Sequence, residues 1–196
     1  MTILPLYDRP QYADQVTDWL WHAFGGDGLS RAFFASIIDH SQRPGALPLT
    51  FIAVEDAKLL GTVGLWRCDL ISRQDLWPWM AALYVTPEAR GRGLAGQLQR
   101  HVMSYAAQQG YTELHLYSAC RDFYERFGWQ YLGDALDYPD TTVHLYRYDL
   151  TSSAGAITEC RRTSVGLNRW VISGSGLFSA SANASSAAWV AMVTIG

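Results

Sequence analysis

Residues 83–98 read LYVTPEARGRGLAGQL and are the most informative part of the chain. An apolar run ends at Pro87, a turn with two arginines and three glycines follows, and an amphipathic segment begins at once. This order predicts a strand, a glycine-rich loop and a helix. Glycines let a ligand approach the backbone closely, and the free N–H groups and dipole of a helix start attract an anion. The cations of Arg90 and Arg92 add to this positive field, so the loop suits a phosphate group.

The three glycines of this loop also match a different motif. Gly91, Gly93 and Gly96 have the spacing G-x-G-x-x-G of dinucleotide-binding proteins. That fingerprint needs an acidic residue at the end of the next strand, about 20 residues further on. The next expected strand, Glu113–Tyr117, has its only acidic residue at its start. A dinucleotide-binding oxidoreductase therefore stays an alternative that the sequence disfavours.

Two motifs together favour another interpretation. The segment R-x-x-G-x-A at residues 90–95, preceded by V-x-P at residues 85–87, resembles the acyl-CoA pyrophosphate loop of the GCN5-related N-acetyltransferases, the GNAT superfamily. Residues 122–129 read DFYERFGW and resemble the family's second signature, an aromatic pair followed after a short spacer by glycine and an aromatic residue. The resemblance covers most of residues 1–150 and none of the chain after that.

The hydrophobic pattern of residues 1–150 gives a matching order of elements. Strands are expected at residues 2–6, 50–54, 58–67, 79–85, 113–117, 129–133 and 142–150, and helices at 11–24, 30–38, 93–109 and 120–127. This is the order of the GNAT fold. The resemblance implies an α/β (α+β) architecture, with a mixed central β-sheet flanked by helices on both faces.

Composition limits the class of protein. A chain of 196 residues with 49% hydrophobic residues and a net charge of −3 can form one compact domain with a sizeable core. The slightly negative charge disfavours nucleic acid as a partner. Cys68, Cys120 and Cys160 are widely spaced and odd in number, which fits neither a disulfide framework nor a metal cluster. We therefore expect no metal and a cytoplasmic location, and the N-terminal residues do not resemble a signal peptide.

The composition changes after Leu150. Residues 151–196 are rich in Ser, Ala and Gly, and residues 170–196 carry no charge. Three interpretations are open: a membrane anchor, which the many serines disfavour, a small additional structural element, or a poorly ordered or accreted tail. We expect the tail, no membrane association, and a domain division into a GNAT domain at residues 1–150 and a tail at residues 151–196.

The GNAT resemblance implies acetyl-CoA as co-substrate. In the family, backbone amides of the loop surround the CoA pyrophosphate, and the pantetheine arm pairs with the exposed edge of the preceding strand. Carried over to this chain, the loop amides belong to Arg90, Gly91, Arg92, Gly93, Leu94, Ala95 and Gly96, and the strand positions are Leu83, Tyr84 and Val85.

The resemblance also implies that Tyr124 is the catalytic acid. The family places a tyrosine at this position of the second signature, where its phenol protonates the thiolate that leaves when the acetyl group is transferred. A phenol with a pKa of about 10 can donate a proton at neutral pH. The alternative is that Tyr124 only packs against Trp129. The neighbouring aromatic residues Phe123, Phe127 and Trp129 are expected in the core.

The general base is not evident in the sequence. Many GNAT relatives carry a glutamate in the strand before the loop, but residues 79–85 contain no carboxylate. The candidates are Asp75, His22, Asp27, His115 and a chain of water molecules, and an amine of low pKa needs no base at all. For the oxyanion, the family suggests a backbone N–H near Ala82 or Leu83, provided that a β-bulge frees it.

The amine site is expected between the first two helices and the strand ends near Trp66, Trp77 and Trp79. These tryptophans either form an apolar or cation-binding wall or belong to the core. The negative net charge suits a cationic amine, and a polyamine, an aminoglycoside, an amino acid and a peptide N-terminus all remain possible.

The resemblance thus implies an acyl-CoA-dependent N-acyltransferase. It moves an acetyl group from acetyl-CoA to a primary amine, either a small molecule or a peptide N-terminus, by direct attack in a ternary complex. The missing strand glutamate supports an alternative, a non-catalytic acyl-CoA-binding sensor of the same fold. A homodimer is possible, with residues 142–150 as its edge.

Overall fold

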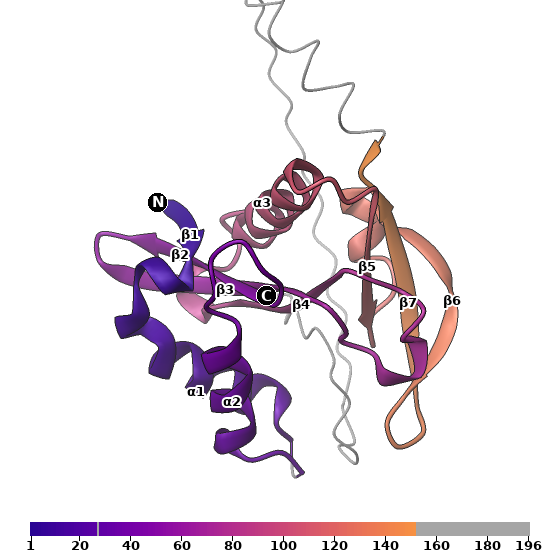
Figure 1. The fold of residues 1–196 in the computed structure, drawn as a ribbon, viewed down its shortest axis with the longest axis horizontal. Coiled ribbons are helices and arrows are strands. Elements are labelled where there is room, and N and C mark those ends of the chain that lie inside the picture. The colour runs from indigo at the N-terminus through magenta and orange to yellow at the C-terminus, as the bar shows by residue number, and fades with distance from the viewer. Residues whose placement is uncertain (27, 152–196) are drawn as a thin grey trace, which may run out of the picture.

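The computed structural model describes residues 1–26 and 28–151, and Figure 1 shows a central sheet with helices on both sides. The strands are β1 (Thr2–Pro5), β2 (Leu49–Glu55), β3 (Lys58–Trp66), β4 (Trp79–Val85), β5 (Glu113–Ser118), β6 (Gln130–Asp137) and β7 (Thr141–Asp149). The helices are α1 (Ala13–Phe24), α2 (Arg31–His40) and α3 (Leu94–Gln108). Short 3₁₀ turns are η1 (Leu6–Asp8), η2 (Pro10–Tyr12), η3 (Ile71–Arg73), η4 (Pro87–Ala89) and η5 (Tyr124–Phe127).

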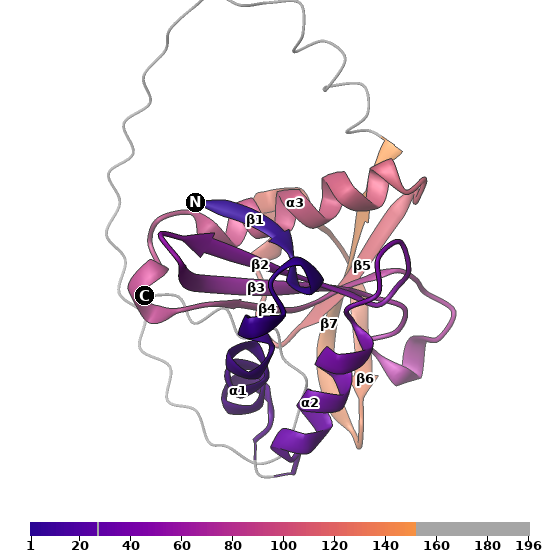
Figure 2. The same cartoon turned by 60° about the vertical axis from the view of Figure 1, so that its left-hand side comes forward.

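The sheet is divided in the middle. Its strand order is β1-β2-β3-β4-β5-β7-β6, and every neighbouring pair is antiparallel except β4 and β5. These two parallel strands share a single register pair, Trp79 with His115. Figure 2 shows β5, β6 and β7 running away from the direction of β2, β3 and β4. Beyond Trp79, the edge of β4 that faces β5 therefore has no strand partner among the described residues.

Two apolar layers hold the helices against the sheet (Figure 1). On one face α3 contributes Leu94, Leu98 and Val102 to a cluster that also contains Leu83 of β4. On the other face α1 and α2 pack on side chains of the same strands. Ser30 caps α2, because its hydroxyl accepts a hydrogen bond from the N–H of Phe33. The mixed sheet with helices on both faces is thus confirmed.

Strand β4 contains a β-bulge near its centre. Tyr84 pairs with Thr62 and Ala81 pairs with Gly64, so two residues of β4 oppose the single Val63 of β3. Ala82 has a φ of 50°, in the left-handed region that a residue with a Cβ seldom adopts. Ala81 and Ala82 both pack into the cluster beneath α1 and α2, although alternation would place them on opposite faces. The bulge on which the oxyanion expectation depended is present.

The structure corrects three local expectations. Residues 120–127 form no regular helix: only η5 is helical there, because Asp122 adopts a φ of 67°. The strand expected at 129–133 continues to Asp137 as β6. Strand β7 is not a sheet edge, since it pairs with β5 on one side and β6 on the other. The edge that a homodimer would extend on this side is therefore β6.

No helix among the described residues is long and apolar enough to span a membrane. The tail expected at residues 151–196 lies outside the described residues from residue 152 onward.

Candidate active site where strands β4 and β5 separate

The glycine-rich loop between η4 and α3 leaves space for a ligand. Gly91 and Gly93 adopt φ values of 72° and 73°, and a Cβ added at either position would meet no atom within 4 Å. Gly93 is the N-cap of α3, and no side chain caps the helix there. The first N–H groups of α3 have no acceptor within the helix. The loop thus has the conformation and the open surface that an anion-binding backbone requires.

The two loop arginines have different partners. Arg90 donates from Nε to the carbonyl oxygen of Val85 at 3.3 Å, which fastens the loop to the end of β4. Arg92 forms an ion pair with Glu55, with 2.8 Å between Nη2 and Oε2, and its hydrogen bond lowers the pKa of that carboxyl. The expectation that both cations add to the field is therefore modified, because a carboxylate already compensates the charge of Arg92.

The last residues of β4 present one backbone edge toward the separated strands. On the other edge, Tyr84 pairs with Thr62 and Val85 pairs with Gly61 of β3. The Leu83 side chain is buried in the core on the α3 side. The Tyr84 ring lies 5.1 Å from that of Trp19 in α1. Backbone groups at these positions have the geometry required to pair with an extended ligand.

Tyr124, at the start of η5, is fully buried in the cluster that α3 forms with the sheet. Its ring lies 4.9 Å from that of Phe123, 5.8 Å from Tyr146 and 6.3 Å from Trp129, measured between centroids. Its hydroxyl has no hydrogen-bond partner among the described residues. Burial raises the pKa of Tyr124 above its ordinary value, so the phenol keeps its proton at neutral pH.

Buried hydrogen bonds fix the segment that carries Tyr124. The Trp129 indole donates to Oε1 of Gln99 in α3 at 3.0 Å. The Tyr146 hydroxyl lies 3.2 Å from both the carbonyl oxygen of Cys120 and Oε1 of Glu125, and its single proton is donated to one or shared between the two. Phe123 and Trp129 are buried and Phe127 is partly buried, as expected for core residues. The position of Tyr124 is thus set from both α3 and β7.

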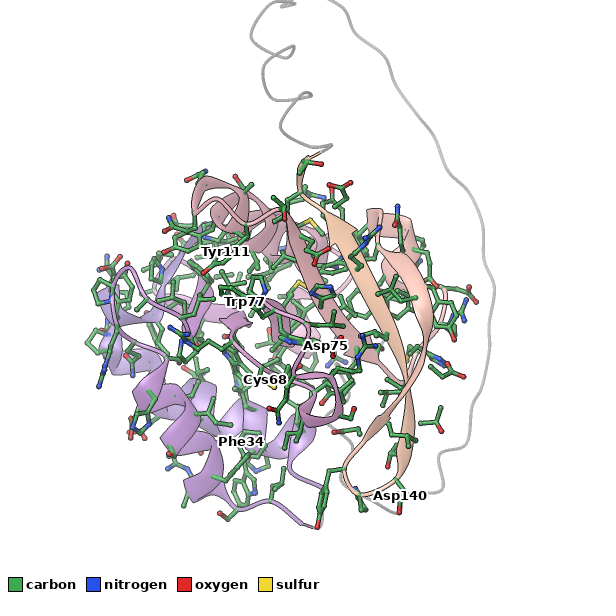
Figure 3. All side chains as sticks on the ribbon, turned by 45° about the vertical axis from the view of Figure 1, so that its right-hand side comes forward. Phe34, Cys68, Asp75, Trp77, Tyr111 and Asp140 are labelled. Atoms are coloured by element: carbon green, nitrogen blue, oxygen red, sulfur yellow. The ribbon has the colours of Figure 1, made fainter. Side chains whose placement is uncertain are left out.

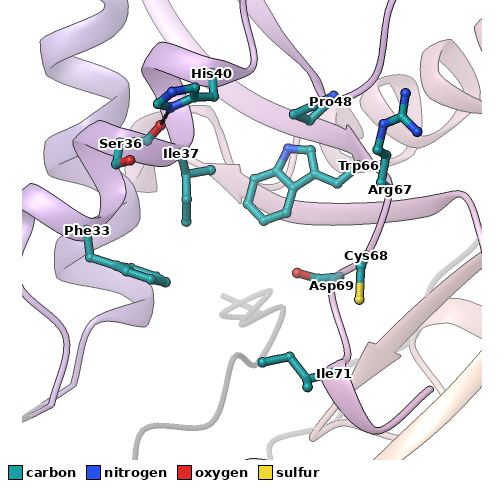
Figure 4. Close-up of a pocket in the computed structure, with 10 residues that line it drawn as sticks. All are labelled: Phe33, Ser36, Ile37, His40, Pro48, Trp66, Arg67, Cys68, Asp69 and Ile71. Carbon is teal, nitrogen blue, oxygen red and sulfur yellow. Dashed lines mark hydrogen bonds between the residues drawn. The ribbon is translucent and has the colours of Figure 1, made fainter. Parts of the chain in front are cut away.

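A cavity of about 470 Å³ lies between α2 and the segment that follows β3 (Figure 4). Its lining residues come from these two parts of the chain and from the loop before β2: Phe33, Ser36, Ile37, His40, Pro48, Trp66, Arg67, Cys68, Asp69 and Ile71. Of the three tryptophans expected near the amine site, only Trp66 lines this cavity. Trp79 is fully buried and donates to the carbonyl oxygen of Leu76, and Trp77 is 53% exposed beside Tyr111 (Figure 3).

Comparison with known proteins identifies the family. Residues 13–129 match the family model described as "Acetyltransferase (GNAT) family". The chain belongs to this family of acetyltransferases. No protein with a curated description matches the chain.

Solved structures agree in fold. Aminoglycoside 6'-N-acetyltransferase from Enterococcus faecium is 15% identical with a TM-score of 0.61, and the match covers 76% of this chain and 97% of that chain. A GNAT family N-acetyltransferase (YhbS) from Escherichia coli in complex with CoA is 25% identical with a TM-score of 0.58, covering 78% and 83%. Spermidine/spermine N-acetyltransferase SpeG from Vibrio cholerae is 14% identical with a TM-score of 0.57, covering 79% and 95%.

None of the described general-base candidates lines the cavity of this GNAT domain. Asp75 is exposed and pairs with Arg73, with 2.8 Å between Oδ2 and Nη2 (Figure 3). His22 is exposed, and its Nδ1 lies 2.6 Å from the carbonyl oxygen of Asp18. His115 is buried, with its ring 5.7 Å from that of Trp79, and burial lowers its pKa. Asp27 lies outside the described residues.

Sequence reasoning missed the carboxylate that does line the cavity. Asp69 follows β3 and extends its carboxyl into the space opposite α2 (Figure 4). Burial and the negative charge of Asp137 raise the pKa of Asp69 to about 8. The only signal in the sequence was an acidic residue in the apolar surroundings of Cys68 and Leu70. Among the described residues, no group of three His, Cys, Asp or Glu side chains is placed to hold a metal ion.

Proposed function

We propose that this GNAT acetyltransferase transfers an acetyl group from acetyl-CoA to a primary amine, either a small molecule or a peptide N-terminus, by direct attack in a ternary complex. The observation that carries the proposal is the Tyr124 hydroxyl, which is buried in the core and has no hydrogen-bond partner among the described residues. A proton donor held in a fixed position suits a reaction that releases a thiolate.

Acetyl-CoA is proposed to bind along the loop and β4. Backbone amides of residues 90–96 surround the pyrophosphate, supported by the open space in front of Gly91 and Gly93. The pantetheine arm pairs with the free edge of Leu83, Tyr84 and Val85 and occupies the place that a neighbouring strand would take. This arrangement brings the thioester to the middle of β4, beside the bulge.

The proposed reaction has one tetrahedral step. The amine nitrogen attacks the thioester carbonyl carbon, and the developing oxyanion is held by a backbone N–H that the bulge at Ala82 and Leu83 frees from the ladder. The carbon–sulfur bond then breaks, and Tyr124 gives its proton to the leaving thiolate. Burial raises the pKa of Tyr124, so the phenol is protonated before the step and gives up its proton less readily than an exposed phenol.

A second candidate function is a non-catalytic acyl-CoA-binding sensor. Strand β4 has no carboxylate, and this observation alone favours the sensor. A sensor and an enzyme both bind acetyl-CoA, but only the enzyme releases CoA thiol when an amine is added. We also propose a cytoplasmic location, and a homodimer stays a prediction for sedimentation analysis.

The first test is calorimetry of the full chain with acetyl-CoA, CoA and NADH. Micromolar binding of acetyl-CoA without binding of NADH supports the proposal, and preferential binding of NADH would restore the oxidoreductase. Thiol release is then measured with a panel of primary amines. Tight acetyl-CoA binding without turnover of any amine would favour the sensor.

A further inference from the structure

We propose that the cavity between α2 and the segment after β3 binds a primary monoamine with an apolar body, and that Asp69 holds its ammonium group and removes its proton before attack. This inference rests on the proposed acetyltransferase function and specifies its acceptor and its general base.

The walls of the cavity are predominantly apolar. Phe33 and Ile37 of α2 lie on one side, and Trp66 and Ile71 lie across from them (Figure 4). Phe33 is 42% exposed and Ile71 is 67% exposed, so large apolar side chains stand open to solvent at this site. A ligand with an aromatic or aliphatic body would remove that surface from water, whereas a highly hydroxylated sugar would leave its polar groups unpaired there.

The charges of the lining fit a single ammonium group. Asp69 is the one carboxylate among the lining residues, and Arg67 is the one permanent cation. The Arg67 guanidinium is held in place because Nε donates to the carbonyl oxygen of Leu47 at 3.1 Å. An approaching ammonium group favours the ionised form of Asp69, which is mostly protonated at neutral pH while the cavity is empty, and pairs with it. A second ammonium group would approach the cation of Arg67. The lining thus disfavours a polycation such as spermidine or an aminoglycoside.

Asp69 connects the cavity with the proposed acid. Trp66 lines the cavity together with Asp69 and packs in the same apolar cluster as Ala81 and Ala82 at the bulge of β4. Burial raises the pKa of Tyr124, and the charge of Asp69 adds to this after Cys120 and Tyr146. The same holds for Tyr117 of β5, whose pKa is raised by burial and then by Asp69 and Asp137. An amine held by Asp69 therefore lies on the face of the sheet that carries α1, α2 and the bulge residues Ala81 and Ala82, beside which the thioester is proposed to bind.

The surroundings of Asp69 suit a general base. The charged and titratable groups around it are Asp137 of β6, Tyr117 of β5, Tyr124 of η5, Cys68 beside it, and Arg67 and His40 at the cavity wall. Burial and the like charge of Asp137 give its carboxylate a stronger affinity for a proton than an exposed aspartate has. General bases work best when their pKa lies near the operating pH.

The proposed step moves one proton from the amine to Asp69 and one from Tyr124 to the sulfur. An alkylamine is protonated at neutral pH, so its nitrogen has no free electron pair. The carboxylate of Asp69 takes one proton from the ammonium nitrogen, and the freed pair attacks the thioester carbonyl carbon. As the carbon–sulfur bond breaks, Tyr124 protonates the sulfur. Asp69 ends protonated and returns its proton to water.

The test compares the full chain with its Asp69→Asn and Asp39→Asn variants. Asp39 is an exposed residue of α2 that does not line the cavity, so its variant controls for loss of one carboxylate near the site. The amine probes are phenethylamine and spermidine, and thiol release is followed with saturating acetyl-CoA. Calorimetry measures the binding of acetyl-CoA and of phenethylamine to each protein.

We expect the wild-type chain to use phenethylamine with a higher kcat/KM than spermidine. Asp69→Asn is expected to lower the kcat for phenethylamine about 100-fold, within the usual range for loss of a general base, without changing the affinity for acetyl-CoA. Because Asp69 must be ionised to act, the kcat/KM of the wild type should rise with pH up to about 8. The kcat/KM of Asp69→Asn should not show this increase. Asp39→Asn should match the wild type throughout.

Stability separates this role from a structural one. The raised pKa means that the folded protein holds the Asp69 proton more tightly than the unfolded chain, so this group makes folding less favourable as pH rises from about 4 toward 8. Asp69→Asn removes that effect and should be at least as stable as wild type at pH 8. Loss of transfer with retained stability and retained acetyl-CoA binding supports the base.

Other outcomes overturn the inference or isolate it from the proposed function. Wild-type rates for Asp69→Asn with phenethylamine would exclude Asp69 as the base, and a preference for spermidine would exclude the monoamine. If no amine is acetylated but phenethylamine binds the wild type and not Asp69→Asn, the acceptor site stands and the proposed function fails. If phenethylamine binds neither protein, the site itself is refuted.

Discussion

Replacement of Gly93 by alanine separates the backbone conformation of the loop from its binding of acetyl-CoA. Gly93 and Gly45 have nearly the same φ, 73° and 71°, and at both positions an added Cβ would meet no atom within 4 Å. Gly45 lies in the loop before β2, far along the chain from the glycine-rich loop. Gly45→Ala is therefore a matched control with the same backbone strain and no steric conflict.

The stability cost of both substitutions follows from the left-handed conformation. An L-residue pays about 1–2 kcal/mol in this region, and the smaller conformational freedom of alanine in the unfolded chain returns about 0.5–1 kcal/mol. The net loss is about 1 kcal/mol, which lowers the Tm of a protein of this size by about 2–4 °C. Thermal unfolding should give the same decrease for Gly93→Ala and Gly45→Ala.

Acetyl-CoA affinity should distinguish the two variants. The Cβ of Gly93→Ala occupies the space that the pyrophosphate needs and displaces at least one hydrogen bond between a loop amide and a phosphate oxygen. Such a bond to a charged group contributes about 1.5–3 kcal/mol, so the Kd measured by calorimetry should rise about 10- to 150-fold. Gly45→Ala should keep the wild-type Kd. Equal Kd values for both variants would refute the placement of the pyrophosphate at this loop.

Three further substitutions test other parts of the site. Tyr124→Phe should lower kcat about 100-fold without lowering Tm or acetyl-CoA affinity, because the lost hydroxyl has no partner among the described residues; unchanged turnover would exclude it as the acid. Glu55→Gln frees Arg92 and should strengthen acetyl-CoA binding at low salt in calorimetry, whereas weaker binding would contradict an attractive field at the loop. Ala82→Gly relieves the strain of a φ of 50° and should not lower Tm, whereas Ala81→Gly, at a position in regular register, should lower it. Equal decreases in Tm for the two variants would argue against strain at the bulge.

The parts of the site that the sequence predicted are encoded locally. The proline, the glycines and the apolar run around residues 83–98 specify where β4 ends and α3 begins, whatever the rest of the chain does. The second signature likewise places Tyr124 beside a glycine with positive φ, Gly128, that ends η5. Local conformation also explains why the helix predicted at residues 120–127 is wrong. Asp122 adopts a left-handed φ, and an aspartate in the sequence does not by itself indicate that conformation.

The acceptor side depends on contacts between distant segments and was therefore not predictable. Asp69 becomes a cavity residue only because α2 packs opposite the end of β3, and its raised pKa requires Asp137 from β6. The tryptophans show the same limit. Trp66 and Trp79 lie opposite each other in neighbouring strands, yet one faces the cavity and the other is enclosed by Tyr117 and its neighbours.

Strand β4 has no carboxylate, but the connection that precedes it carries one, that of Asp69. Strand β4 runs from the cavity end of the sheet toward the loop, and its bulge lies between the two. At the loop, we propose that Arg90 and the start of α3 hold the anionic end of acetyl-CoA. At the opposite end, the residue proposed to hold the amine is Asp69, which comes from the β3–β4 connection rather than from β4 itself. Because a base can come from this connection instead of from β4, the missing strand glutamate is weak evidence for a non-catalytic sensor.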